Sequence, residues 1–474
     1  MATTPHTAAA QSIPLADPAY VGDLGDGLIR RWSTRADLAK IGHLFASVFR
    51  DGPDEPLNIP AGDEARVFMS NGFPLMGPGD FAVVEDTSKP DRPIVASTSV
   101  WRRRWSYGSI EFGVGQPENV ATDPAYRNRG LVRALFAMFH ARSAAEGHLA
   151  QAITGIRYFY RQFGYEYVLD LGGRTYLKLT EISASHESDP APYHLRLATL
   201  ADIPHLQALY NQRRAASLVW QETTDAYWRY HITAWNDVAV RAREITSIGM
   251  LGRLYMIVDQ ADQICGYIWL ASKRWGSDLP IYALELYPNV QWQALLPVLL
   301  PTLRQQAQQT PVAPTNAEPC SELCFHLGRA HPVYELLNTT MTTRYASPYA
   351  WYLRVPDVPA FVRHIAPVLD ARLAASASAG YTGELIFDFY RGGLRLVFAE
   401  GKLNVVEPWQ APLYGEQAHA SCPALLFLQL LFGYRSLADL RATFPDVWAQ
   451  DEVTLLINTL FPTQPSTVYS LTYT

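Results

Sequence analysis

The chain has 474 residues, of which 48% are hydrophobic and 18% are charged, so we expect about two to four globular domains with separate cores. The net charge of −6 is mild and argues against a non-specific nucleic-acid binder, since that class of protein carries a basic excess. Four cysteines are too few for a disulfide framework, and Cys320 and Cys324 match no common zinc-ligand spacing, which predicts a cytoplasmic protein with reduced thiols and no metal site. No apolar run approaches about 18 residues, so no membrane span is expected.

The N-terminal stretch "MATTPHTAAAQSIPLADPAYVGDLGDG" lacks both the basic start and the apolar core of a secretory signal. We therefore expect residues 1–24 to form a loosely attached, flexible tail.

A strand-to-helix unit occurs twice in the chain. Both Arg31–Leu38 and Arg196–Ile203 turn at a Thr-x-Ala-Asp sequence into a segment with helical spacing of apolar residues. Chance recurrence of a common capping pattern is one explanation. Duplication of a whole α/β unit is the sharper hypothesis, and the lengths of the two segments suit it.

A candidate anion site lies between residues 120 and 133. A strand is expected to end at Val120-Ala121-Thr122, before Asp123-Pro124, and Leu131 begins an apolar pattern typical of an amphipathic helix. The backbone N–H groups at a helix start have no intrahelical partner, and Gly130 allows a ligand to approach them closely. Charge-assisted contacts to phosphate are available from Arg127, Arg129 and Arg133. The pattern predicts a pyrophosphate site; an ordinary helix start with solvated arginines is the alternative.

The stretch "GIRYFYRQFGYEY", Gly155–Tyr167, follows downstream. We expect a short helix through Tyr158 to Gln162 that stops at Gly164, a natural C-terminal cap. Packing in an aromatic core is the competing interpretation for most of its aromatic residues.

Two boundaries divide the rest of the chain. The Ser- and Pro-rich linker "EISASHESDPAP" precedes Tyr193, and a second boundary is expected near Trp351, before a helix with Asp357 as its N-cap. In the last segment, alternating runs predict hairpin strands. A buried helix is expected to follow over "SCPALLFLQLLFGYRSLADLRATF", Ser421–Phe444, with Ser421 as N-cap and Pro423 near its first position. We expect domains at residues 25–180, 193–349 and 350–474, the last an α+β domain.

Arg127–Val132 resembles the R/Q-x-x-G-x-G/A loop with which GNAT-type acetyltransferases hold the pyrophosphate of acetyl-CoA, with Val132 in place of a small residue. The whole arrangement resembles the enhanced-intracellular-survival (Eis) family of N-acetyltransferases, most strongly at "VATDPAYRNRGLVRAL", "YRQFGY" and "LLFGYRSLADL". The resemblance implies an α/β (α+β) protein with a tandem GNAT acyl-CoA N-acyltransferase fold. Its second GNAT-like domain is degenerate, because "YPNVQWQALLPVLL" lacks arginines there and should not bind CoA. The C-terminal domain is expected to be sterol-carrier-protein-like.

The resemblance also implies site residues. Tyr160 corresponds to the proton-donating tyrosine, and the base is the α-carboxylate of the last residue, here Thr474. Glu118 is the generic GNAT alternative for the base, with Asp123 behind it. The implied contacts to acetyl-CoA are Val120, Ala121, Thr122, Arg127, Asn128, Arg129, Gly130, Leu131, Val132, Arg133, Gly155 and Ile156.

The activity implied is direct transfer of acetyl from acetyl-CoA to a primary amine of an aminoglycoside, polyamine or lysine-type acceptor. The resemblance also implies a homo-oligomer, for which the family suggests a hexamer. The main alternative is a non-enzymatic lipid- or ligand-binding protein with a regulatory acyl-CoA site. A tandem GNAT of the peptidoglycan-building aminoacyl transferase type is a third hypothesis, against which the arginine loop argues.

Overall fold

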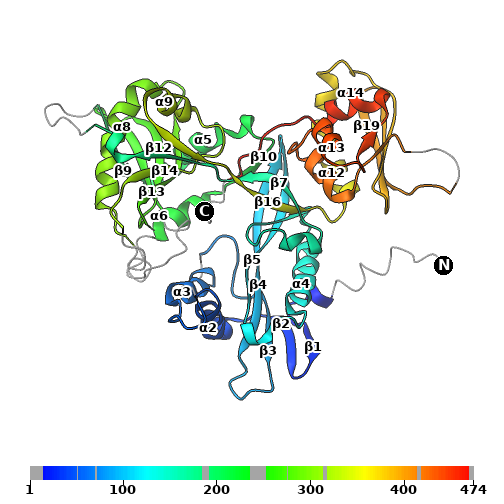
Figure 1. Cartoon of the computed structure of the whole chain (residues 1–474), viewed down its shortest axis with the longest axis horizontal. Helices are drawn as coiled ribbons and strands as arrows, with labels where there is room; N and C mark the ends of the chain where they lie inside the picture. The colour runs from blue at the N-terminus through cyan, green and yellow to red at the C-terminus, as the bar shows by residue number, and fades with distance from the viewer. Residues whose placement is uncertain are drawn as a thin grey trace.

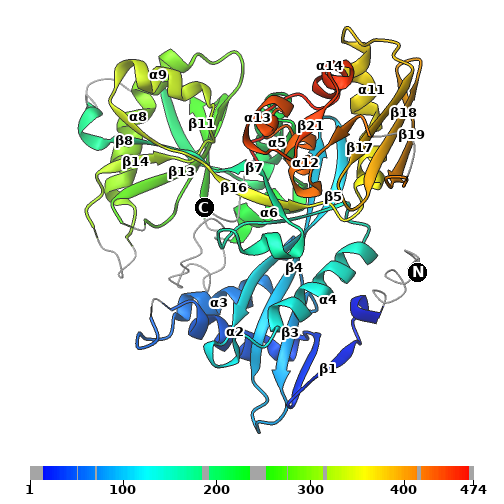
Figure 2. The same ribbon diagram turned by 45° about the vertical axis from the view of Figure 1, so that its right-hand side comes forward.

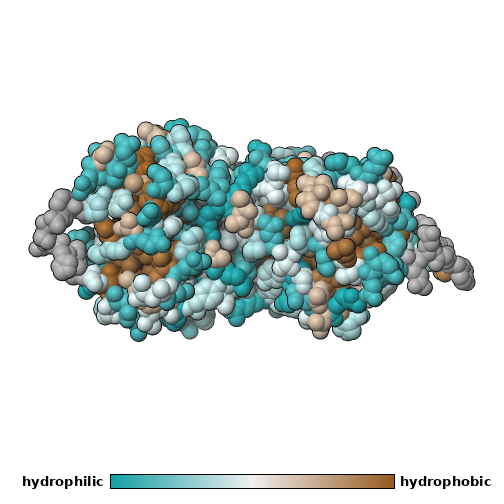
Figure 3. Space-filling view, turned by 90° about the horizontal axis from the view of Figure 1, so that it is seen from above, coloured by the Kyte–Doolittle hydropathy of each residue, from teal (hydrophilic) through white to brown (hydrophobic). Residues whose placement is uncertain are grey.

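The computed structural model describes residues 14–50, 52–69, 72–183, 192–234, 252–274, 276–312, 318–413 and 418–468, and it arranges them around three sheets (Figures 1 and 2). Seen from above, the face in Figure 3 is mostly hydrophilic, with separate hydrophobic patches on two bulges. Within the described ranges, no helix combines the length and apolarity needed to cross a bilayer.

The first sheet follows the strand order β1-β2-β3-β4-β5-β6-β16-β7, with β10 paired to β4. Alternate residues of β3 face opposite layers: Phe81 and Val83 pack with α2 and α3, whereas Ala82 and Val84 pack with α4. The strands are β1 (Val21–Gly25), β2 (Leu28–Trp32), β3 (Phe81–Asp86), β4 (Ile94–Tyr107), β5 (Ile110–Thr122), β6 (Ala150–Ile153), β7 (Glu166–Leu171), β10 (Val219–Glu222) and β16 (Tyr349–Arg354), and the helices are α2 (Leu38–Val48), α3 (Ile59–Phe68) and α4 (Leu131–Ala145).

The second sheet follows the order β9-β11-β12-β13-β14-β8-β15. Its strands are β8 (Arg174–Lys178), β9 (Tyr193–Leu197), β11 (Arg253–Asp259), β12 (Ile264–Leu270), β13 (Asp278–Leu286), β14 (Glu322–Phe325) and β15 (Thr343–Ala346), and its helices are α5 (Ile203–Asn211), α6 (Asp225–Thr233), α8 (Trp292–Gln309) and α9 (Pro332–Thr340).

The two sheets repeat one topology and exchange one strand. From β2 and β9 onwards, each has four strands in matching order, a parallel pair (β5–β6 or β13–β14) connected through a helix (α4 or α8), and two more antiparallel strands. The penultimate strand of each sheet comes from the other unit: β16 follows the second unit yet lies in the first sheet, and β8 precedes the second unit yet lies in the second sheet. This shared order favours duplication over chance recurrence.

The repeated strand-to-helix units have the same local structure. Thr34 and Thr199 each form a capping box with an aspartate three residues later. Each aspartate also accepts two hydrogen bonds from an arginine, with Arg31 at 2.7 and 2.8 Å from Asp37 and Arg196 at 2.8 Å from both oxygens of Asp202.

The third sheet has the order β19-β18-β17-β20-β21 and belongs to the C-terminal part of the chain. Its buried apolar residues join those of β4, β7 and β16 in one cluster, so this part packs directly on the first sheet. Its strands are β17 (Gly383–Asp388), β18 (Gly393–Ala399), β19 (Lys402–Trp409), β20 (Ala420–Ser421) and β21 (Trp448–Ala449), and its helices are α10 (Val358–His364), α11 (Ala366–Ala374), α12 (Ala424–Leu431), α13 (Leu437–Thr443) and α14 (Asp451–Leu460).

Several local expectations are confirmed and two are wrong. Asp357 caps α10 by accepting from the Ala360 N–H at 2.8 Å, as predicted, and the hairpins form. The predicted N-cap Ser421 instead lies in β20, paired with Trp448, and α12 begins only after Pro423. The expected long helix breaks into α12 and α13 at Gly433, whose φ of +64° leaves the helical region.

The expectation of a flexible tail over residues 1–24 is wrong for its described part. Residues 21–25 form β1, which pairs with β2. The Trp32 indole N–H donates to the Leu15 carbonyl at 2.9 Å, and Arg142 Nε donates to the Ala16 carbonyl at 2.8 Å. These bonds attach the segment to the first sheet and α4.

Asp202→Asn should destabilise the protein by about 2 kcal/mol at neutral pH, because it weakens a charged, bidentate contact with Arg196. Burial raises the pKa of Asp202, but the hydrogen bonds from Arg196 and Thr199 lower it overall to about 2. Because the folded pKa lies below the unfolded one, the stabilisation is present above about pH 4 and is lost as pH falls through about 2. Chemical unfolding at neutral and acid pH measures the difference. The exposed pair Asp225–Arg229 gives the control, since Asp225→Asn should change stability by less than about 0.5 kcal/mol; equal effects would contradict the prediction.

Candidate active site

The first sheet opens between two parallel strands. Among the described residues, β5 and β6 pair only at Val114–Ala150 and Gly115–Gln151. β5 then continues to Thr122 without a partner on that side, so the carboxyl ends of the two strands separate. Ligands of open α/β sheets bind at such edges, which makes this gap the candidate site.

A bulge in β5 adjoins the gap. The register with β4 shifts by one residue between Ser97 and Ser99, and Asn119 has a left-handed φ of +53°. Hydroxyl groups of β4 hold this backbone: Ser99 Oγ donates to the Glu118 carbonyl at 3.1 Å, and Ser97 Oγ donates to the Asn119 carbonyl at 3.3 Å. The bulge therefore re-aims the strand, and Val120 packs in the cluster that contains Tyr160.

The predicted anion loop follows β5. Asp123 caps a 3₁₀ turn by accepting from the Ala125 N–H at 2.8 Å, and both Asn128 (φ +64°) and Gly130 (φ +73°) are left-handed. α4 starts at Leu131, as expected, and its N-cap is Gly130, which has no side chain to cap the first N–H groups. A Cβ atom at Gly130 would meet nothing within 4 Å, so this helix start is open.

The arginines of the loop are exposed around the helix start. Arg129 lies over the Tyr126 ring at 5.3 Å, and Arg133 lies over the Phe163 ring at 5.4 Å and donates to Gln162 at 3.1 Å. Arg127 is exposed at the preceding turn. The loop thus combines open backbone N–H donors, the positive end of a helix dipole and long, exposed arginine side chains, which together suit a diphosphate.

Tyr160 lies beside the gap, in the 3₁₀ helix η3 (Phe159–Phe163), which ends at Gly164 with φ +85° as predicted. Only 3% of Tyr160 is exposed, and a Cβ atom at Gly155 would lie 3.8 Å from its hydroxyl. Burial, and to a smaller extent the charge of Glu118, raise the pKa of Tyr160. It therefore remains a neutral phenol, able to donate a proton, at physiological pH.

The neighbouring aromatic residues pack rather than face the gap. The Tyr165 hydroxyl pairs with His140 at 3.0 Å inside the core, and Phe163 stacks on Phe136 at 4.5 Å. Tyr158 is 69% exposed, in a left-handed conformation. Of Tyr158, Tyr160, Phe163 and Tyr165, Tyr160 is the one whose hydroxyl lies next to Gly155, in the loop after β6.

Tyrosines from the exchanged strand hold the loop after β6. Tyr349 donates to the Gly155 carbonyl at 2.8 Å, and Tyr352 donates to the Ile156 carbonyl at 3.2 Å. Tyr167 accepts from the Tyr158 N–H at 2.9 Å. Sequence reasoning missed Tyr349 and Tyr352, because they lie on β16, far along the chain, and no local pattern marks them.

Glu118 is the carboxylate at the bulge. It is 7% exposed, and burial raises its pKa to about 7, against the opposing effects of a hydrogen bond from Gln116 and the positive charge of Arg103. A carboxylate with a pKa near neutrality is suited to accept a proton. Asp123, in contrast, uses a carboxylate oxygen for its cap.

Thr474, the other predicted base, lies outside the described residues. The last described residue is Val468, whose carbonyl accepts from the Trp351 indole N–H at 3.2 Å. The described chain therefore ends against β16, the strand that also carries Tyr352.

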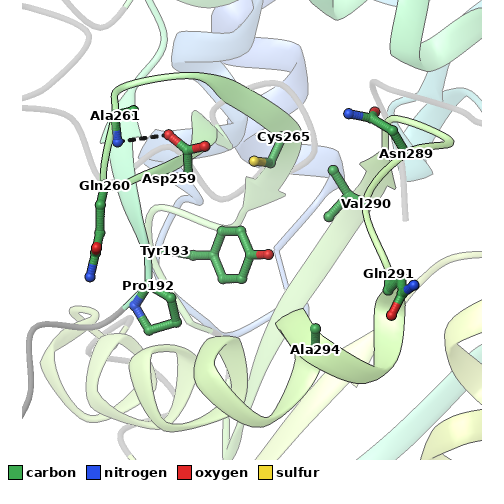
Figure 4. A pocket seen from close by; sticks show the side chains of 10 residues that line it. All are labelled: Pro192, Tyr193, Asp259, Gln260, Ala261, Cys265, Asn289, Val290, Gln291 and Ala294. Carbon is green, nitrogen blue, oxygen red and sulfur yellow. Dashed lines mark hydrogen bonds between the residues drawn. The ribbon is translucent and has the colours of Figure 1, made fainter.

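The second unit has a pocket at the corresponding helix start (Figure 4). It measures about 550 Å³ and lies against the beginning of α8, with Tyr193, Asp259, Cys265 and Gln291 among its lining residues. None of the ten residues shown is a lysine or arginine. The pocket thus lacks the cations that surround Gly130, and Asp259 brings the opposite charge.

The first part of the chain matches a known domain family. Residues 30–168 match the model described as "Acetyltransferase (GNAT) domain". This span covers the strand-to-helix start, the bulge, the arginine loop and Tyr160. No curated protein matches the sequence.

Solved structures share the fold along nearly the whole chain. A GCN5-related N-acetyltransferase from Anabaena variabilis is 15% identical, with a TM-score of 0.60 over 94% of this chain and 100% of its own. A GCN5-related N-acetyltransferase from Kribbella flavida is 18% identical, with a TM-score of 0.59 over 94% of this chain and 98% of its own. Eis1 from Mycobacterium abscessus is 16% identical, with a TM-score of 0.54 over 93% and 99%. At these identities the likeness establishes the α/β fold, and the domain match identifies residues 30–168 as a GNAT-type acyltransferase domain.

Proposed function

We propose that the GNAT-type domain transfers an acetyl group from acetyl-CoA to a primary amine, in one direct step. The observation that carries this proposal is the juxtaposition of the open, arginine-rich start of α4 with the gap between β5 and β6, beside Glu118 and Tyr160. The acceptor class is an aminoglycoside, a polyamine or a lysine-type amine.

In this proposal the diphosphate of CoA binds the backbone N–H groups of the loop and the first residues of α4, from Asn128 to Val132, and the arginine side chains surround it. The pantetheine arm then runs between the separated strands, along Val120-Ala121-Thr122 on one side and Gly155-Ile156 on the other. This places the thioester at the bulge, next to Tyr160.

The chemistry follows from the charges that must move. An alkylammonium has a pKa of about 10, so the amine must lose a proton before its nitrogen attacks the thioester carbon. The neutral nitrogen adds to the thioester carbon and forms the C–N bond, and backbone N–H groups at the bulge are suited to stabilise the oxyanion that results. The C–S bond then breaks, and the nitrogen releases its second proton as the amide forms. Tyr160 then protonates the leaving thiolate, whose conjugate thiol has a pKa of about 8.5.

We propose Glu118 as the acceptor of the amine proton, because it is buried at the bulge with a pKa of about 7. The α-carboxylate of Thr474 is the competing candidate from the family resemblance. We also propose a division along the chain into units at residues 25–180, 193–349 and 350–474, the last of sterol-carrier-protein type. Across these boundaries, β8 adds to the second sheet and β16 to the first. The residues of α12 are buried in the cluster shared with β7, which supports a structural role for this unit over lipid binding.

Replacing Arg129 and Arg133 together by alanine should weaken acetyl-CoA binding by about 10- to 100-fold, because each removes a charge-assisted contact to phosphate. Calorimetric titration with acetyl-CoA measures the effect. Arg66→Ala, on the exposed side of α3, is the matched control. Unchanged affinity in the double variant, or no binding by the wild type, would contradict the site.

Tyr160→Phe should lower kcat by about 10²- to 10⁴-fold with little change in acetyl-CoA affinity, because only the proton donor is lost. Tyr165→Phe, in the same segment but bonded to His140, should retain most of the activity. CoA release with spermidine, kanamycin or a lysine amide as acceptor gives the rate. Wild-type turnover by Tyr160→Phe would remove Tyr160 from the mechanism.

Two variants distinguish the bases. We expect Glu118→Gln to lower kcat/KM by about 10²- to 10⁴-fold, whereas removal of the last three residues, 472–474, should leave it within a few-fold of the wild type. The reverse result would assign the base to the Thr474 carboxylate.

A further inference from the structure

A buried arginine is connected to Glu118 through a glutamine. Arg103 on β4 donates from Nε to the Gln116 side-chain oxygen, and the Gln116 amide nitrogen donates to Glu118 Oε1. Arg103 is 3% exposed and Gln116 is fully buried, so this connection runs through the protein interior.

The direction of these bonds is fixed by chemistry. A guanidinium group only donates, so the Gln116 oxygen must face Arg103. The Gln116 NH₂ group must then face Glu118, where it stabilises the ionised carboxylate. Arg103 thus orients the Gln116 side chain so that its NH₂ group, the positive end of the amide dipole, points at the Glu118 carboxylate.

The second unit completes the connection. Gln221 lies on β10, which precedes α6 and pairs with β4, and its side-chain oxygen accepts from Arg103 Nη1 at 2.8 Å. Its backbone carbonyl accepts from the Tyr210 hydroxyl of α5 at 3.0 Å. Arg103 is thereby held between a glutamine of its own sheet and a glutamine from the second unit.

We propose that Gln116 and Arg103 are positioning residues that keep Glu118 available as a proton acceptor, and that Gln221 of the second unit holds Arg103 in place. This inference rests on the proposed function, in which Glu118 accepts the proton of the amine. It assigns the second unit a role in the reaction, although its own helix start lacks arginines.

Apart from Glu118, the titratable groups within this connection and around it come from four elements. Arg103 lies on β4, Tyr160 on η3, Tyr210 on α5 and Tyr227 on α6, with His231 packed on Tyr227 at a ring distance of 4.4 Å. Burial raises the pKa of both Tyr160 and Tyr227, so these phenols stay uncharged near neutral pH. Arg103 therefore supplies the positive charge that acts on Glu118.

The chain offers a matched control on the other side of the same sheet. Gln151 on β6 is also fully buried and accepts from an arginine, Arg354, at 2.6 Å. Its amide donates to the Ser143 hydroxyl at 3.1 Å instead of to a carboxylate. Gln151→Met therefore tests the loss of a buried arginine–glutamine contact without a change at Glu118.

The experiment compares Gln116→Met, Gln221→Met and Gln151→Met in the full chain. kcat/KM for acetyl-CoA with spermidine is measured from about pH 5.5 to about pH 9, with CoA quantified by chromatography. We expect Gln116→Met to move the acidic limb upward by about one pH unit, which is about tenfold slower turnover on the acid side. Gln221→Met should move it by less in the same direction, and Gln151→Met should leave it in place. An unchanged limb in Gln116→Met, or an equal shift in Gln151→Met, would overturn the inference.

Thermal unfolding against pH tests the same inference without turnover. Because the folded pKa of Glu118, about 7, exceeds its unfolded value of 4.5, the associated stability is present below about pH 4.5 and is lost as pH rises through about 7. Glu118→Gln should abolish this loss, Gln116→Met should extend it to higher pH, and Gln151→Met should retain it. If the wild type releases no CoA with any acceptor, the proposed function fails while this readout still decides the inference. If Gln116→Met does not fold, Gln221→Met decides it, and wild-type behaviour there in both measurements would refute it.

Discussion

The site depends on one constraint, the short pairing between β5 and β6. Two residue pairs join these strands, and beyond them β5 has no partner on that side among the described residues. The bulge at Asn119, held by hydroxyl groups of β4, adds a second departure from a regular sheet at the same place. Both features cost backbone pairing, and both open the sheet where the arginine loop, Tyr160 and Glu118 meet.

The exchange of strands makes the two sheets depend on each other. β16 lies between β6 and β7, so the chain must complete its second unit before the first sheet is whole. The same strand brings Tyr349 and Tyr352 to the carbonyl groups at Gly155 and Ile156. With β10 paired to β4 and β16 paired to β6 and β7, the second unit contacts the first sheet at two places. These contacts give a physical reason for a repeated unit that does not carry the arginine loop.

Local features could be predicted from the sequence, and contacts across the fold could not. The start of α4 at Leu131 and the end of η3 at Gly164 follow from spacing and glycine conformation within a few residues. Tyr349, Tyr352 and Gln221 escaped prediction because their roles depend on which strands pair, which is a property of the whole chain. Ser421 was assigned wrongly for the same reason, because pairing with Trp448 overrode a good capping residue. The positions of the other contact residues around the loop remain predictions.

Hydrogen exchange with and without acetyl-CoA tests the central claim most directly, because it observes the backbone N–H groups themselves. The account predicts slower exchange in the first turn of α4, at residues 129–134, and at the bulge around Val120, with no change at the start of α8. Equal exchange with and without the ligand at both places, or protection at α8 instead, would contradict it.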